Sequence, residues 1–190
     1  MSNIYNLILM DLKKISIQEN SWNRFFLFKK FFLSRSVRII ILVRMLKYNY
    51  IIAFICSRIL RKKNIEVSST AEIGEGVFFP HPWCIIVAGG SIIGNNVSIG
   101  QYVTIGGNFK KTRINLDQTI QKLPIIGDRV MIHPGAVIGG PIIIGNDVII
   151  GANSVVTHDV PSNSIVYGQN KLAKKKIKVL PTGGEFYIIN

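Results

Sequence analysis

The chain of 190 residues is poor in cysteine: Cys56 and Cys84 are the only two. Two cysteines are too few for the disulfide framework of a small secreted domain, so we expect a reducing compartment, the cytoplasm. The first ten residues lack a basic stretch ahead of an apolar one, which argues against a cleavable signal peptide. The longest uncharged apolar run, from Tyr48 to Ser57, is far shorter than the roughly 20 residues of a membrane-spanning helix.

Histidine is also scarce, and its three copies are His81, His133 and His158. They are so far apart in the sequence that they do not form a ligand set with the spacing of a zinc site. We therefore expect no bound metal.

Acidic residues are nearly absent from the first third of the chain. Residues 1–64 contain 13 Lys and Arg but only Asp11 and Glu19, whereas residues 65–190 contain 10 basic and 8 acidic residues. The net charge of +13 is thus concentrated at the front. Positive charge alone does not indicate nucleic-acid binding, and the rest of the chain shows no nucleic-acid-binding module, so we expect no such partner.

The basic front is also aromatic and aliphatic. From Trp22 to about Arg61 there is no Gly or Pro, which favours two or three helices with a break at Asn49. Residues 1–20 read as a short helix or loop. Two interpretations stay open: a helical cap packed on the core and on neighbouring subunits, or a surface over residues 22–63 that also contacts an anionic membrane peripherally.

What dominates the sequence is an aliphatic residue at every sixth position, followed by a small or turn-forming residue. The clearest runs are Val87, Ile93, Ile99 and Ile105, and then Ile126, Ile132, Ile138, Ile144, Ile150 and Val156. A step of six fits neither a lone strand nor a helix, but it fits a short strand followed by a turn. Three such units close a triangular coil of roughly 18 residues, one rung of a parallel β-helix. The pairs 95–96, 128–129 and 146–147 fall at its corners.

The repeat is interrupted twice. From Phe79 to Val87 the step is eight, so two extra residues bulge out within residues 80–84. From Ile105 to Ile126 the step is 21, three more than a whole coil, and we interpret the interruption as a loop over about 107–124. The sequence thus divides into a basic helical region (1–64), a β-helix (65–168) and a basic tail (169–190).

Residues 65–168 resemble the hexapeptide-repeat acyltransferases, and residues 144–161 are similar to their shared signature. Within them, the chain looks most like the serine acetyltransferases and the polysaccharide O-acetyltransferases of the colanic acid acetyltransferase type. This resemblance implies a left-handed β-helix, an exception to the right-handed crossover rule. It also implies a homotrimer, or a dimer of trimers, with acetyl-CoA bound in clefts between subunits.

By the same resemblance, the catalytic histidine falls on His81 and its acidic partner on Glu66. An imidazole that takes the proton of an attacking hydroxyl contributes on the order of 10²–10⁴-fold, and a carboxylate on the other ring nitrogen fixes the tautomer. Alternatives remain: His81 as a structural residue of the bulge, and His133 as a residue that lines the CoA cleft or is simply exposed. We expect Cys84 to be a packed thiol rather than an acyl carrier.

The resemblance maps recognition of the pantetheine arm onto Gly106, Gly107, Pro134 and Ala152, where small residues let the arm approach the backbone. The phosphates and adenine would lie toward Lys171 and Lys174. A solvated tail is the alternative for these lysines.

The acceptor is predicted from two departures. Serine acetyltransferases have an Asp before the catalytic His and a further His before the Pro that resumes the solenoid, whereas this chain has Pro80 and Leu123. A sugar hydroxyl needs no charged clamp, so we expect O-acetylation of a bacterial capsular or exopolysaccharide saccharide. The alternatives are a serine O-acetyltransferase of cysteine biosynthesis and a non-catalytic trimeric scaffold.

Overall fold

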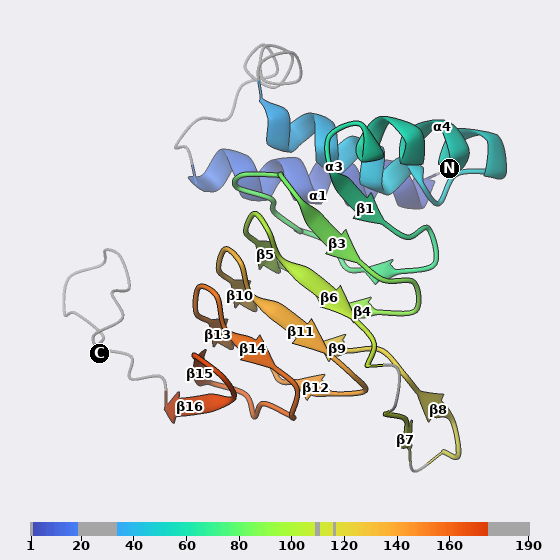
Figure 1. The fold of residues 1–190 in the computed structure, drawn as a ribbon. Coiled ribbons are helices and arrows are strands. Elements are labelled where there is room, and N and C mark those ends of the chain that lie inside the picture. The colour runs from blue at the N-terminus through green and yellow to red at the C-terminus, as the bar shows by residue number, and fades with distance from the viewer. Residues whose placement is uncertain (1, 19–33, 109–110, 116, 175–190) are drawn as a thin grey trace.

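The structure, a computed structural model, describes residues 2–18, 34–108, 111–115 and 117–174. Three helices lie together across the N-terminal end of a β-solenoid (Figure 1). They are α1 (Ser2–Gln18), α3 (Arg35–Met45) and α4 (Tyr50–Arg61). The aromatic stretch from Trp22 to Phe32 lies outside the described residues.

The solenoid has three parallel sheets, named here in the order in which the chain visits them. The first sheet contains β1 (Ile65–Val67), β3 (Ile85–Val87), β6 (Thr104–Gly106), β11 (Val137–Gly139) and β14 (Val155–Val156). The second contains β2 (Glu72–Ile73), β4 (Ile92–Ile93), β9 (Ile125–Ile126) and β12 (Ile143–Ile144). The third contains β5 (Ser98–Ile99), β10 (Met131–Ile132), β13 (Ile149–Ile150), β15 (Ser164–Tyr167) and β16 (Lys171–Lys174).

The coil is left-handed, as expected. In Figure 1 the strands of the first sheet run from left to right in front, and the chain then returns behind them while it descends. At the far end, β16 pairs antiparallel with β15 and closes the third sheet. The mostly β fold with a helical N-terminal region is therefore confirmed.

The hexad aliphatics form the core. Ile99, Ile105, Ile126, Ile132 and Ile138 are each at most 2% exposed. Because each coil buries these side chains only against the coils above and below, stability comes from stacking. The step of six therefore predicted the core correctly.

The predicted corners also form. Asn96, Arg129 and Asp147 adopt positive φ angles of 58°, 56° and 57° between the second and third sheets. Beside them a ladder of side-chain oxygens accepts backbone N–H groups from the coil before: Asn95 from Glu75, Asp128 from Asn95, and Asn146 from Asp128. The ladder satisfies backbone donors that a sharp corner would otherwise leave unpaired.

The helices are fixed to the first coil by a buried ion pair. The Arg44 Nε and Nη2 atoms lie 2.7 and 2.9 Å from the two carboxylate oxygens of Asp11. The same guanidinium donates to the carbonyl oxygens of Ile73 and Gly74, and Asp11 accepts the N–H of Val77. One ion pair thus joins α1, α3 and the solenoid.

Helix α4 begins at the predicted break, because the Asn49 side chain accepts the N–H of Ile52 at 2.9 Å as an N-cap. Within the described residues, every helix is too short or too polar to cross a bilayer.

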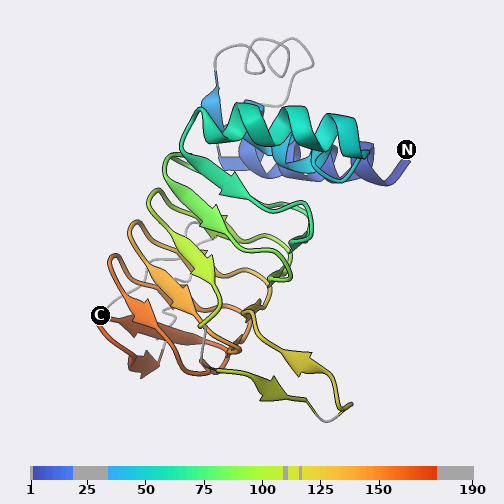
Figure 2. The same ribbon diagram turned by 45° about the vertical axis from the view of Figure 1, so that its right-hand side comes forward.

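The long insertion is a hairpin rather than an open loop. Its strands β7 (Arg113–Ile114) and β8 (Ile120–Gln121) pair antiparallel and project away from the solenoid (Figure 2). Ile105 pairs with Ile138, and Ile126 pairs with Ile93 of the second sheet. The stretch from Ile105 to Ile126 is therefore one step of six with about 15 inserted residues, not a whole coil plus three.

Candidate active site

The site predicted around His81 lies at the corner between the third and first sheets, which we call the His81 corner. In the first coil this corner is the bulge 80–84, and in later coils it is 100–102, 133–135 and 151–153. Ile65 pairs with Ile85, twenty residues on, whereas Ile86 pairs with Thr104, eighteen residues on. The two extra residues of the bulge make this corner different from those stacked below it.

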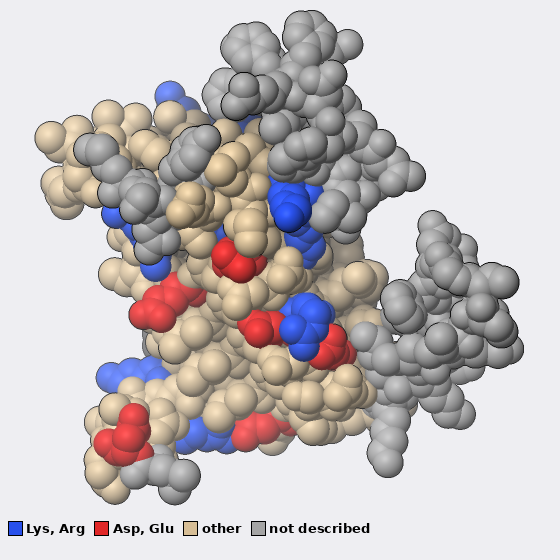
Figure 3. Space-filling model, turned by 180° about the vertical axis from the view of Figure 1, so that it is seen from behind, with Lys and Arg blue, Asp and Glu red and all other residues tan. Residues whose placement is uncertain are grey.

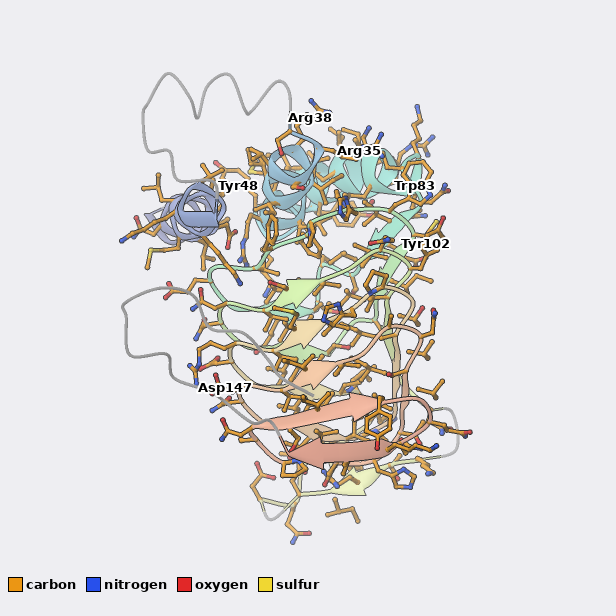
Figure 4. All side chains as sticks on the ribbon, turned by 90° about the vertical axis from the view of Figure 1, so that its left-hand side faces the viewer. Arg35, Arg38, Tyr48, Trp83, Tyr102 and Asp147 are labelled. Carbon is orange, nitrogen blue, oxygen red and sulfur yellow. The ribbon has the colours of Figure 1, made fainter. Side chains whose placement is uncertain are left out.

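The bulge is held from two sides. From α3, the Ser36 hydroxyl donates to the Pro80 carbonyl at 3.2 Å, and the Arg35 guanidinium lies 5.2 Å from the centre of the Trp83 ring. From the next coil, the Tyr102 N–H donates to the Trp83 carbonyl at 2.9 Å. Figure 4 shows Trp83 and Tyr102 at one corner with Arg35 above them. These contacts fix the backbone on both sides of His81.

A cavity of about 300 Å³ opens at this corner. His81, Gln101 and His133 line it from three successive coils, together with Phe78, Pro80, Ser98, Gly100, Met131, Ile132 and Pro134. Neighbouring strands lie ~4.8 Å apart, so the backbones that carry His81 and His133 are separated by roughly 10 Å. A cavity of this volume accommodates a molecule the size of an amino acid.

Gln101 adds an unpaired polar group beside this cavity. Its Oε1 atom is buried and has no hydrogen-bond partner among the residues that the structure describes. Buried amide oxygens in proteins are normally paired, so this one is available to a ligand donor. A neighbouring glycine keeps the corner tight, because a Cβ at Gly100 would lie 2.8 Å from the Pro134 nitrogen.

Glu66 lies on the outer side of β1, at the edge of the first sheet next to the His81 corner. It lines a separate hollow with Arg61, Cys84 and Ile86. Among the hydrogen bonds of the described part of the chain, none joins Glu66 to His81. The structure therefore places the two residues at the start and at the end of the first coil without bringing their side chains together.

The residues predicted to bind CoA fall into two groups on opposite edges of the first sheet. Gly106 and Gly107 lie where β6 enters the hairpin, whereas Pro134 and Ala152 lie at the His81 corner. Gly106 is paired with Gly139, and a Cβ on either would meet nothing within 4 Å. This pair leaves an open strip of bare backbone that suits a flexible arm.

The two lysines predicted for the phosphates lie on β16 at the far end of the solenoid. Lys171 is exposed. Both are remote in the stack from the bulge, so an extended ligand would have to run along several coils to reach them.

Three residues of the site were not predicted: Arg35, Ser36 and Gln101. The contacts of Arg35 and Ser36 with the bulge join segments more than 40 residues apart in the sequence, and no local sequence pattern predicts them. Gln101 had a signal, since it occupies the corresponding corner one coil after His81.

Comparison with known proteins agrees with this architecture. Residues 124–158 match the family model for bacterial transferase hexapeptide (six repeats). The serine acetyltransferase of Staphylococcus xylosus is 39% identical over 123 residues, which cover 64% of this chain and 54% of the relative. Serine acetyltransferase 2 of Arabidopsis thaliana is 36% identical over 112 residues, which cover 59% of this chain and 32% of the relative.

Solved structures extend the likeness to the helices. The structure of Neisseria gonorrhoeae serine acetyltransferase matches all of this chain and 67% of its own, with a TM-score of 0.71 and 24% identity. A serine acetyltransferase in complex with CoA matches 99% of this chain and 70% of its own, with a TM-score of 0.68 and 24% identity. At such identities the likeness concerns the fold.

The chain is similar to the hexapeptide-repeat transferase family, whose model matches residues 124–158, 35 of its 190 residues. Its similar relatives are named serine acetyltransferases, and it spans about half the length of the curated relatives it matches.

These relatives correct the predicted acceptor. The prediction of a capsular or exopolysaccharide saccharide, and of a colanic acid acetyltransferase type, is wrong, because the relatives are named for serine. The prediction treated Pro80 and Leu123 as decisive. It overlooked that the cavity beside His81 has other polar groups, Gln101 and His133, supplied by later coils.

Proposed function

We propose that the protein is a cytoplasmic acetyl-CoA-dependent O-acetyltransferase whose acceptor is the hydroxyl of L-serine, as in cysteine biosynthesis. The observation that supports this most is the sequence likeness to serine acetyltransferases, at 36–40% identity over 104–123 residues. The cavity at the His81 corner, which His81, Gln101 and His133 help to line, is the second support.

His81 is the general base. Its ring takes the serine hydroxyl proton as the oxygen attacks the acetyl carbonyl carbon, which gives a tetrahedral oxyanion. The carbon–sulfur bond then breaks, and the CoA thiolate leaves and takes that proton from the imidazolium. The products are O-acetylserine and CoA. A backbone held rigidly around His81 serves this step, because general-base catalysis depends on position before it depends on pKa.

Glu66 is the partner of His81 in this proposal. It lies on β1, at the start of the coil that ends in the bulge, and both side chains are exposed. In the substrate complex the His81 ring turns toward the first sheet and meets this carboxylate. There the carboxylate would fix the ring tautomer and stabilise the imidazolium. Hydrogen bonds of this kind often close only when substrate is bound.

The donor lies along the first sheet. The bare strip at Gly106 and Gly139, together with Gly107, accepts the pantetheine arm, and Pro134 and Ala152 bound it at the other edge. Lys171 and Lys174 supply positive charge at the end of the stack for the phosphates.

In a homotrimer, the two edges of the first sheet, at the hairpin and at the His81 corner, would contribute to one cleft between subunits. The outer faces of the sheets carry exposed aliphatic side chains, among them Ile86 and Val137 on the first sheet and Met131 on the third. Such faces favour burial against another copy of the chain, and a first-to-third-sheet contact closes with three copies. The His81 corner of one copy would then face the first sheet of its neighbour.

The amino acid is held by Gln101 and His133. The Gln101 amide oxygen accepts from the ammonium group, and the His133 ring donates to the carboxylate across the cavity. These two residues replace the clamp that Pro80 and Leu123 do not provide.

The test is release of the CoA thiol from acetyl-CoA with and without L-serine. We expect serine-dependent release in the native chain and a fall in kcat on the order of 10²–10⁴-fold for His81→Ala. His158→Ala, at another corner, is the matched control for His81→Ala. Glu66→Gln should also lower kcat, because the imidazolium loses its carboxylate partner, and Glu72→Gln is its control. Release that does not respond to serine, or an active His81→Ala variant, would refute the proposal; a native chain that releases no CoA at all would favour the non-catalytic scaffold.

A further inference from the structure

Helix α4 exposes a broad apolar strip to solvent. Tyr50, Ile51, Phe54 and Ile55 are 86%, 69%, 53% and 50% exposed, and Ile59 adds 37%. The opposite side of the helix buries Cys56 and Leu60 against the rest of the protein. Single exposed apolar residues are common on protein surfaces, but a continuous apolar strip on one helix is not. We therefore expect this face of α4 to bind a partner.

The same helix is basic and contains no acid. Arg58, Arg61 and Lys62 are exposed at its C-terminal end, and Lys47 is exposed just before its start. The Arg58 guanidinium lies 5.8 Å from the centre of the Phe54 ring. No Asp or Glu occurs anywhere in residues 20–65. Over the solenoid, by contrast, acidic and basic side chains lie next to one another (Figure 3), as in the Arg129–Asp147 ion pair.

We propose that α4 is a membrane-surface helix that docks the protein peripherally on an anionic phospholipid bilayer. Its aromatic and aliphatic strip would enter the boundary between headgroups and acyl chains, while Arg58, Arg61 and Lys62 pair with the anionic headgroups. The helix satisfies its own backbone hydrogen bonds and can enter the interface without exposing unpaired groups.

The charge distribution favours lipid over a second copy of the chain. A two-fold contact through α4 would use the same surface on both copies, so the basic end with Arg58, Arg61 and Lys62 would meet a face that is also basic. With no acidic residue in 20–65 to pair with them, that contact brings like charges together. An anionic bilayer provides the opposite charge. The proposal does not depend on which acceptor the active site uses.

The experiment is sedimentation of the full chain with vesicles of phosphatidylcholine, with and without phosphatidylglycerol, at low and high salt. We expect binding only to the anionic vesicles, and a loss of binding as salt rises. Ile51→Ser with Phe54→Ser should abolish it, and Arg58→Gln with Lys62→Gln should weaken it by about fivefold for each charge removed. Ile114→Ser is the matched control, since Ile114 is an exposed isoleucine on the hairpin.

Circular dichroism and sedimentation without vesicles check that each variant folds and keeps its oligomeric state. Three results would overturn the proposal. They are absence of binding at low salt, equal binding to neutral vesicles, and α4 variants that bind as the native chain does. If Ile51→Ser with Phe54→Ser instead lowers the oligomeric mass of a chain that binds no vesicles, α4 is a contact between copies.

Discussion

Removal of Arg44 should loosen the helical cap from the solenoid. The guanidinium makes two hydrogen bonds to Asp11 and one each to the Ile73 and Gly74 carbonyls, with both charged side chains at most 4% exposed. In Arg44→Met the Asp11 carboxylate stays buried without its counter-ion. Breaking a buried pair from one side costs about 3–5 kcal/mol, so we expect a loss of that size in the free energy of unfolding.

The measurement is urea unfolding followed by circular dichroism at one fixed protein concentration, because oligomerisation shifts apparent stability. Arg61→Met, at an exposed arginine on α4, is the control and should change stability by about 0.5 kcal/mol or less. The double variant Asp11→Leu with Arg44→Met should cost less than the sum of the two single changes, since neither charge is then left alone. An Arg44→Met variant within 1 kcal/mol of the native chain, or strictly additive costs, would contradict the account.

Three further predictions concern the cap, the core and the site. Burial lowers the pKa of Lys14 from 10.5 to about 8, and the charge of Asp11 opposes this shift. As the pH rises, the folded chain therefore loses this proton before the unfolded chain does, so the free energy of unfolding should rise between about pH 8 and 10.5. Lys14→Met should flatten that rise, as urea unfolding at the two pH values would show. Ile138→Ala, at a residue with no exposed surface, should cost about 2–5 kcal/mol by the same assay. His133→Gly should raise the KM for L-serine about ten- to a hundredfold and leave the KM for acetyl-CoA unchanged, which steady-state kinetics would show; an unchanged serine KM would remove His133 from the acceptor site.

The hexad step was sufficient to predict the core because it is a local signal. Each aliphatic that returns every six residues is buried by the coils on either side, and the same count gives the corners at Asn96, Arg129 and Asp147. The bulge around His81 was predicted for the same reason, since a step of eight in place of six leaves two residues without a position in the strand.

The position of His133 at the corner of His81 was missed because of one error in counting. When the 21 residues after Ile105 are taken as a whole coil plus three, Ile126 falls on the first sheet and His133 at a different corner from His81. The structure puts Ile126 on the second sheet, which moves His133 to the His81 corner. The step of six is the same on all three sheets. It therefore does not show on which sheet the repeat resumes after an insertion.

No local sequence pattern predicted two further sets of contacts. They are the ion pair of Asp11 with Arg44, and the contacts of Arg35 and Ser36 with the bulge. They join segments 33 and 44 or more residues apart, through single side chains that obey no period. Contacts of this kind depend on how the helices pack on the first coil, and that packing is determined by many residues at once.

The two interruptions of the repeat explain where the chemistry can be. A regular solenoid presents the same corner again and again, so a unique site requires a place where the repeat fails. The bulge interrupts the repeat at one edge of the first sheet, where α3 contacts it. The hairpin interrupts it at the other edge, at Gly106 and Gly107. Between them lie the outer side chains of β3, β6 and β11, which are exposed on β3 and β11 and half-buried on β6. The first sheet is therefore the face on which both irregular features converge, and a ligand or second copy that rests on it touches both at once.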